Sequence, residues 1–310
     1  MSALLALIAV RSVVLLAALL AALALGGPVA AILPLHLLKQ HAITLAATLG
    51  RKLNRSRRDV ATRAWRGVIV LGILLLPAML LGWVIAPSPA GSGVLLFVMF
   101  ALALRANVMW PLWRQARKGT IALQTRYPHH LFPDSHAVLR YRILEHSRHF
   151  AVGVVGVGFW FLALGPAGAL GYLALALAAG HYSDAHDETQ VFGSVARALF
   201  SVADFVPHRL TAFLLVLAGF FVPGSRSLAA LPLAMRTEAN WPRFIATLVD
   251  VSLGGPTPVA RRSAQLPWVG TGTAQLHATH VGRWLAIWGV ACLGLALLVM
   301  PALFYANPLK

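Results

Sequence analysis

The chain has 310 residues, of which 59% are hydrophobic and only 11% charged, and this composition excludes an ordinary water-soluble enzyme. Lysine and arginine number 26 against 9 aspartates and glutamates, a formal charge of +17 that suits either nucleic acid or anionic lipid. The single cysteine excludes a disulfide framework and a cysteine-based zinc site within one chain. Uncharged runs of membrane length favour the lipid interpretation.

These apolar runs follow one another along the chain, and the longest reach the roughly 20 residues that a helix needs to cross the hydrocarbon core. They predict an all-α, polytopic integral membrane protein with about five or six transmembrane helices in a single membrane domain over residues 1–310. The first run has no basic segment before it, so we expect it to be retained and not cleaved as a signal peptide. The expected spans lie near 12–35, 68–86, 88–104, 150–180, 210–225 and 284–304.

The run over residues 150–180 carries no charge and is interrupted at Gly165-Pro166. A Gly-Pro pair marks a turn or a kink, because proline cannot continue the hydrogen bonding of a helix. The run is therefore either one long kinked span or a tight helical hairpin, and its length is compatible with both.

Basic residues gather between the runs. Residues 51–66 hold seven basic residues and one acid, and residues 105–148 hold eight against two. Because basic loops stay on the cytoplasmic side, both are expected on the inner face of a bacterial cytoplasmic membrane. The acid-rich segment 181–208 then lies outside if residues 150–180 cross once, and in the cytoplasm if they form a hairpin.

The dense basic run over residues 51–58 also fits phosphate binding. A basic segment beside a span is, however, what anionic inner-leaflet lipid attracts. We therefore expect membrane lipid, and not nucleic acid, as the partner of this segment.

Histidine pairs raise the further hypothesis of a metal-ion carrier. On a helix, an i,i+3 pair faces one way and can hold a divalent metal. These groups lie outside the uncharged runs, and no carboxylate lies inside one, so we assign no metal site. The candidate groups are His146 with His149, His277 with His280, and His181, Asp184, His186, Asp187 and Glu188.

Short motifs in one order cover most of the chain. Residues 201–212 resemble the signature N-W/Y-x-P-A-R-L-T-A, residues 153–160 resemble G-V-V-A-P-L-F-W, and residues 166–172 resemble P-G-A-L-A-Y. Downstream, Trp241-Pro242, Gly254-Gly255-Pro256 and residues 267–272 follow the order G-W-P, V-x-L-G-G-P and P-x-L-G-D-G. Together they resemble the adenosylcobinamide-phosphate synthase family (CobD/CbiB), membrane proteins of cobalamin biosynthesis.

The resemblance implies ATP-dependent formation of an amide between adenosylcobyric acid and aminopropanol or its phosphate. It implies ATP and Mg²⁺ as cofactors, and a corrinoid substrate or other proteins of the cobalamin pathway as partners. By the same resemblance, the expected catalytic residues are Arg209, Asp204 and Glu238. The expected substrate-binding residues are Trp241, Gly254, Gly255 and Pro256.

Several polar positions of the family are apolar here. The aspartate of its L-G-D-P motif is replaced by Gly27, and the polar face of K-x-x-N-T-x-D falls on Leu173, Ala176, Leu177 and Ala179. Alanine or leucine cannot replace an oxygen ligand of Mg²⁺, so whether the chain is an enzyme stays open. The loss is similar to that in AmpE, a relative described as a membrane modulator of β-lactamase induction. A non-catalytic signalling protein of that kind is the alternative, and a metal-ion carrier is the third hypothesis.

Overall fold

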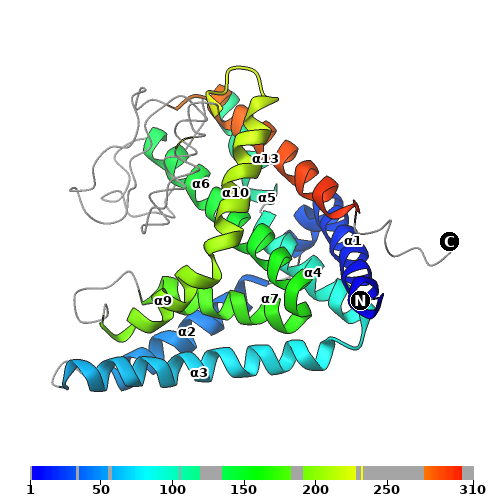
Figure 1. Cartoon of the computed structure of the whole chain (residues 1–310). Coiled ribbons are helices and arrows are strands. Elements are labelled where there is room, and N and C mark those ends of the chain that lie inside the picture. The colour runs from blue at the N-terminus through cyan, green and yellow to red at the C-terminus, as the bar shows by residue number, and fades with distance from the viewer. Residues whose placement is uncertain are drawn as a thin grey trace. The chain divides into compact units, whose positions relative to one another are not determined.

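A computed structural model of the chain describes residues 2–32, 35–54, 58–104, 106–118, 135–182, 191–227, 232 and 276–301 (Figure 1). The predicted all-α fold is confirmed, since these residues form helices and turns and include no strand. The helices are α1 (Ser2–Ile32), α2 (Leu35–Leu53), α3 (Val60–Ile85), α4 (Pro89–Leu104), α5 (Ala106–Arg117), α6 (Ser135–Phe150), the π-helical η1 (Ala151–Gly156), α7 (Val157–His181), α9 (Ser194–Ala203), α10 (Phe205–Phe220) and α13 (Ala278–Val299).

The polytopic membrane fold is also confirmed. In the described part of the chain, four helical segments are long and apolar enough to cross a bilayer, and a fifth is added if α9 and α10, which meet at 54°, form one broken span. Helix α4 is apolar but has only 16 residues, or about 24 Å of helix. The four segments are Ala6–Gly26, Val60–Ile85, Arg142–His181 and Ala278–Val299. Each of the six runs predicted from the sequence overlaps one of the described helices.

Helix α3 has the surface of a lipid-facing span. Its side chains Trp65 and Trp83 are 70% and 71% exposed. The two lie about 27 Å apart along the helix axis, close to the thickness of a hydrocarbon core. Tryptophan is enriched at both membrane interfaces, so these two side chains mark where the apolar length of α3 begins and ends.

The chain divides into two compact units. The first comprises Met1–Leu102, Val152–Pro207 and Ala302–Lys310, and the second comprises Ala103–Ala151 and His208–Pro301. The single membrane domain expected over residues 1–310 stays a prediction.

Within the first unit, the chain folds back on itself at Gly165. The backbone there has φ 72° and ψ −158°, a region that essentially only glycine adopts. Tyr172 consequently contacts Gly156 and stacks on Trp160 with ring centroids 6.5 Å apart. In a straight helix Gly156 and Tyr172 would be about 24 Å apart. Residues 150–180 therefore have the shape of the helical hairpin and not of one long kinked helix, and a double crossing of the membrane stays a prediction.

Arg11 of α1 satisfies the backbone at this turn. Its Nη1 donates to the carbonyl oxygens of Leu162 and Ala163, each at 2.9 Å. The carbonyl of Leu162 has no intrahelical donor because Pro166, four residues on, lacks an N–H. Since an unsatisfied carbonyl in hydrocarbon costs several kcal/mol, a charged side chain within an apolar helix has a structural reason here.

The second arm of the hairpin, residues 166–181, packs along α3 in the opposite direction (Figure 1). Ala167 lies against Gly82, where a Cβ would come within 2.5 Å of the Ala167 Cα. Beyond the far end of the arm, the carbonyl of Phe192 lies against Gly67. Small residues permit such close approach between membrane helices. The arm therefore ends beside the start of α3, not beside its end.

Candidate functional site

Two of the predicted site residues, Asp204 and Arg209, fall within the described part of the chain. Asp204 belongs to the first unit and separates α9 from α10. Arg209 belongs to the second unit, where its half-buried side chain lies on α10. Glu238, Trp241, Gly254, Gly255 and Pro256 lie outside the described residues.

Asp204 is a buried acid, only 3% exposed. The hydroxyl of Tyr172 donates to its Oδ1 at 2.6 Å, and both groups are buried. Of the acids that the structure describes, Asp59 is exposed and Glu145 is 21% exposed, so only Asp204 is buried. A desolvated carboxyl group is costly without a donor, and ionisable groups inside membrane segments usually serve a function.

The backbone beside Asp204 is fixed by a second hydrogen bond. The carbonyl of Ala203 would normally accept from the residue four positions on, but that residue is Pro207, which has no N–H. The indole Nε1 of Trp160 donates to this carbonyl at 3.1 Å instead. Trp160, on the first arm of the hairpin, thus supplies the hydrogen bond that the Ala203 carbonyl lacks at the 54° break between α9 and α10.

Aromatic rings surround the carboxyl group. The ring of Tyr172 stacks on Trp160 and lies 5.7 Å from the ring of Phe200. A Cβ at Gly156 would lie 2.5 Å from two carbons of the Tyr172 ring, so the space for the ring depends on this glycine. Gly156 closes the π-helical η1, and π-helical turns are frequent at functional sites. We call Gly156, Trp160, Tyr172, Phe200 and Asp204 the Asp204 cluster.

The Asp204 cluster lies within the apolar length of α3. Gly171, next to Tyr172, packs against Met79, whose Cγ would be 2.9 Å from a Cβ at that glycine. Met79 lies between Trp65 and Trp83 along α3. The cluster therefore lies beside the apolar part of α3.

Sequence reasoning did not single out Tyr172 or Trp160 as site residues. Both stand in stretches that carry the family resemblance, yet an aromatic side chain in an apolar run is usually a packing residue. The sequence could have pointed to them in one way: a tyrosine hydroxyl or an indole N–H that is buried needs a hydrogen-bond acceptor. The hairpin brings these donors to the Asp204 carboxyl group and the Ala203 carbonyl.

In the second unit, His146 has a structural role. Its Nε2 lies 2.8 Å from the Leu104 carbonyl at the end of α4, and the indole Nε1 of Trp284 donates to its Nδ1 at 3.1 Å. Because Nδ1 is an acceptor, the ring is neutral and Nε2–H donates to Leu104. His146 thus links the end of α4 to α6 and α13, and both ring nitrogens are occupied.

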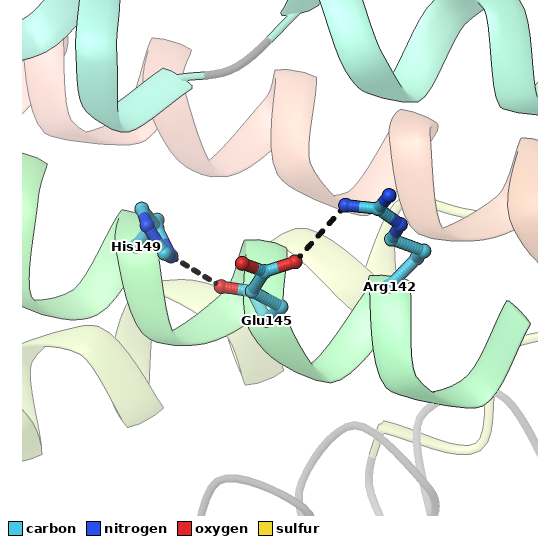
Figure 2. A network of polar contacts seen from close by, with 3 residues as sticks. All are labelled: Arg142, Glu145 and His149. Carbon is cyan, nitrogen blue, oxygen red and sulfur yellow. Dashed lines mark hydrogen bonds and ion pairs between the residues drawn. The ribbon is translucent and has the colours of Figure 1, made fainter. Parts of the chain in front are cut away.

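The other histidines in the described pairs also bond locally. On α6, His149 Nδ1 donates to the Glu145 carbonyl at 2.8 Å, while the Glu145 carboxylate pairs with Arg142 at 3.2 Å (Figure 2). At the start of α13, the His277 N–H donates to His280 Nδ1 at 3.0 Å.

Among the described residues, no three His, Cys, Asp or Glu side chains lie close enough to hold a metal ion. The metal-carrier hypothesis therefore gains no support. The same observation means that the described side chains do not form a set suited to Mg²⁺, so the expectation of Mg²⁺ and ATP rests on the family resemblance. Of the third predicted ligand group, all but His181 lie outside the described residues.

Comparison with known proteins gives one family. The model of the family described as CobD/Cbib protein matches residues 15–288. The chain is similar to Cobalamin biosynthesis protein CobD of Brucella suis biovar 1, with 27% identity over 198 residues that cover 60% of each protein. The protein of that name from Klebsiella pneumoniae is 26% identical over 155 residues, or 47% of this chain and 49% of that one.

The protein of the same name from Brucella anthropi is 32% identical over 118 residues, covering 38% of this chain and 34% of the relative. The alignments thus span about three fifths or less of the curated relatives' length. No solved structure was found to match the chain.

Proposed function

The chain belongs to the CobD/Cbib protein family, and from this premise we propose that it acts in cobalamin biosynthesis. The proposed reaction is the ATP-dependent joining of adenosylcobyric acid to aminopropanol or its phosphate through an amide bond. The chain carries it out as a multi-pass protein of the bacterial cytoplasmic membrane. Its basic loops face the cytoplasm and contact anionic lipid, and its partners are the corrinoid substrate and other proteins of the pathway.

One observation supports the proposal most strongly. Residues 153–160, 166–172 and 201–212 resemble three separate motifs of the family, and the structure brings one side chain of each into the Asp204 cluster. Motifs retained only for membrane insertion would have no reason to form a buried hydrogen-bonded cluster. Their convergence supports a retained functional scaffold despite the apolar replacements.

The proposed roles follow the chemistry of the side chains. Arg209 stabilises the negative charge that develops as a phosphoryl group activates the corrinoid carboxyl group. Asp204 accepts a proton from the ammonium group of the amine, which must be deprotonated before it attacks. Glu238 is the third proposed catalytic residue, and Trp241, Gly254, Gly255 and Pro256 are proposed to bind substrate.

Complementation tests the proposal in cells. The native chain is expressed in a bacterium that lacks its own cobinamide-phosphate synthase and depends on de novo cobalamin for growth. We expect the native chain to restore growth and Arg209→Ala to abolish it, because alanine removes the guanidinium charge. Immunoblotting of the membrane fraction controls for expression of both proteins.

Failure of the native chain to restore growth while it is present in the membrane would contradict the proposal. The non-catalytic signalling alternative would then be tested next, by comparing β-lactamase induction with and without the chain.

A further inference from the structure

Two tyrosines of the second hairpin arm and its end, Tyr172 and Tyr182, each donate a buried hydrogen bond, but to different kinds of acceptor. The hydroxyl of Tyr182 donates to the backbone carbonyl of Ala46 at 2.8 Å. The hydroxyl of Tyr172 donates to the Asp204 carboxyl group at 2.6 Å. The first bond joins α2 to the hairpin, whereas the second acts on a side chain that can take part in chemistry.

The bond from Tyr172 to Asp204 is held from several sides. Trp160 stacks on the Tyr172 ring and at the same time donates to the Ala203 carbonyl, next to Asp204. The Phe200 ring lies against Tyr172 from α9. The donor and the backbone of the acceptor are therefore both fixed by the same indole, and the carboxyl oxygen has a defined orientation.

This arrangement is more than packing requires. A hydrocarbon side chain in place of Asp204 would pack among Trp160, Tyr172 and Phe200 without the cost of a buried carboxyl group. An acid held in place by a tyrosine hydroxyl is instead what an accurately oriented proton acceptor needs.

We propose that Tyr172 is a positioning residue, which orients the Asp204 carboxylate toward the amine in the amide-forming reaction. The inference rests on the proposed function, and nothing else so far assigns a role to Tyr172. Tyr172 acts through Asp204 and does not itself contact the reacting atoms. Its removal should slow the chemical step without weakening substrate binding.

The experiment compares Tyr172→Phe with Tyr182→Phe in the full chain, purified and placed in lipid nanodiscs. Each substitution removes one hydroxyl and keeps the ring, so the pair is matched in volume and in the loss of one buried hydrogen bond. Burial raises the pKa of Tyr182 to about 12, so its hydroxyl remains a donor at any pH of the assay. Amide formation is followed with adenosylcobyric acid, aminopropanol phosphate, ATP and Mg²⁺.

We expect Tyr172→Phe to lower kcat by roughly 10- to 100-fold, the range for a lost hydrogen bond to a charged group, with both KM values unchanged. Tyr182→Phe should keep the native kcat, and its thermal midpoint should fall by less than that of Tyr172→Phe, because the acceptor it loses contact with is a neutral carbonyl. A native kcat for Tyr172→Phe, or equal losses of kcat in both variants, would overturn the positioning role while leaving the proposed function intact.

A second variant covers the case in which Tyr172→Phe does not fold. Gly156→Ala keeps the hydroxyl but pushes the Tyr172 ring away, because the added Cβ would overlap it. The positioning role predicts the same fall in kcat, and an unchanged kcat would contradict it. If the native chain forms no amide at all, the proposed function fails, and the role of Tyr172 in it fails too.

Discussion

A carboxyl group buried among hydrocarbon side chains depends on the few polar groups that reach it. For Asp204 the structure provides the Tyr172 hydroxyl, and Trp160 fixes the neighbouring carbonyl. The family signature that residues 201–212 resemble has an asparagine at this position, and an amide cannot accept a proton, so the proton-accepting role proposed for Asp204 belongs to this chain and not to the signature. An asparagine side chain can also accept from the tyrosine through its amide oxygen, so the hydrogen bond and the negative charge are separable.

Substitutions at Asp204 should therefore separate folding from chemistry. Asp204→Asn keeps an acceptor and should keep the thermal midpoint close to native. Asp204→Ala leaves the buried Tyr172 hydroxyl without this acceptor and should destabilise the protein by about 1–3 kcal/mol. Thermal unfolding followed by circular dichroism in detergent measures both, with Asp59→Asn at the exposed cap of α3 as the control. Equal midpoints for the two Asp204 variants would show that the Tyr172 contact does not stabilise the fold.

Asp204 and Arg209 could be predicted from the sequence, because both stand in the motif that residues 201–212 resemble. Tyr172 and Trp160 could not be predicted in this way, because their partners are distant along the chain and the residue type alone indicates packing. The local sequence pattern does not predict the chain reversal that brings residues 156 and 172 together.

The hairpin itself illustrates the limit of reading helices from hydropathy. An uncharged run of residues 150–180 meets the length condition for one span, and the Gly165-Pro166 pair signals only a break. Whether a break is a kink or a reversal depends on what satisfies the freed carbonyls, and here that is Arg11, far away in sequence. The helices were predictable from composition, but the direction of the second arm was not.

The direction of this arm makes a prediction about topology. Because the arm ends beside the start of α3, Ser194 should lie on the same membrane face as Arg58, and Ser88, just past the end of α3, on the opposite face. Because basic loops stay on the cytoplasmic side, we expect the first face to be the cytoplasmic one. Single cysteines at these three positions, introduced with the buried Cys292 changed to alanine, are treated with a membrane-impermeant thiol reagent in spheroplasts.

Ser88→Cys should react in intact spheroplasts, whereas Arg58→Cys and Ser194→Cys should react only after permeabilisation. If Ser194→Cys also reacts in intact spheroplasts, as Ser88→Cys does, residues 181–208 lie on the outer face and the hairpin topology is excluded. Reaction after permeabilisation serves as the control that each cysteine is accessible.

For the whole molecule, composition and hydropathy were sufficient to predict an all-α polytopic membrane protein, because a bilayer requires long apolar helices whatever the function. The site depends on a few polar side chains whose positions are set by packing. Asp204 is buried in the first unit, so water cannot replace a hydrogen-bond donor that its carboxyl group loses. Function is therefore decided by which polar groups survive, not by the scaffold.

Product formation by the native chain is the decisive test of the proposed reaction. The full chain in nanodiscs is incubated with adenosylcobyric acid, aminopropanol phosphate, ATP and Mg²⁺, and the corrinoids are analysed by mass spectrometry. A protein with established cobinamide-phosphate synthase activity serves as the positive control under the same conditions. We expect a new corrinoid whose mass is that of the acid plus the amine minus water, formed only with ATP. Its absence, in an assay where the control protein forms it, would contradict the proposed reaction.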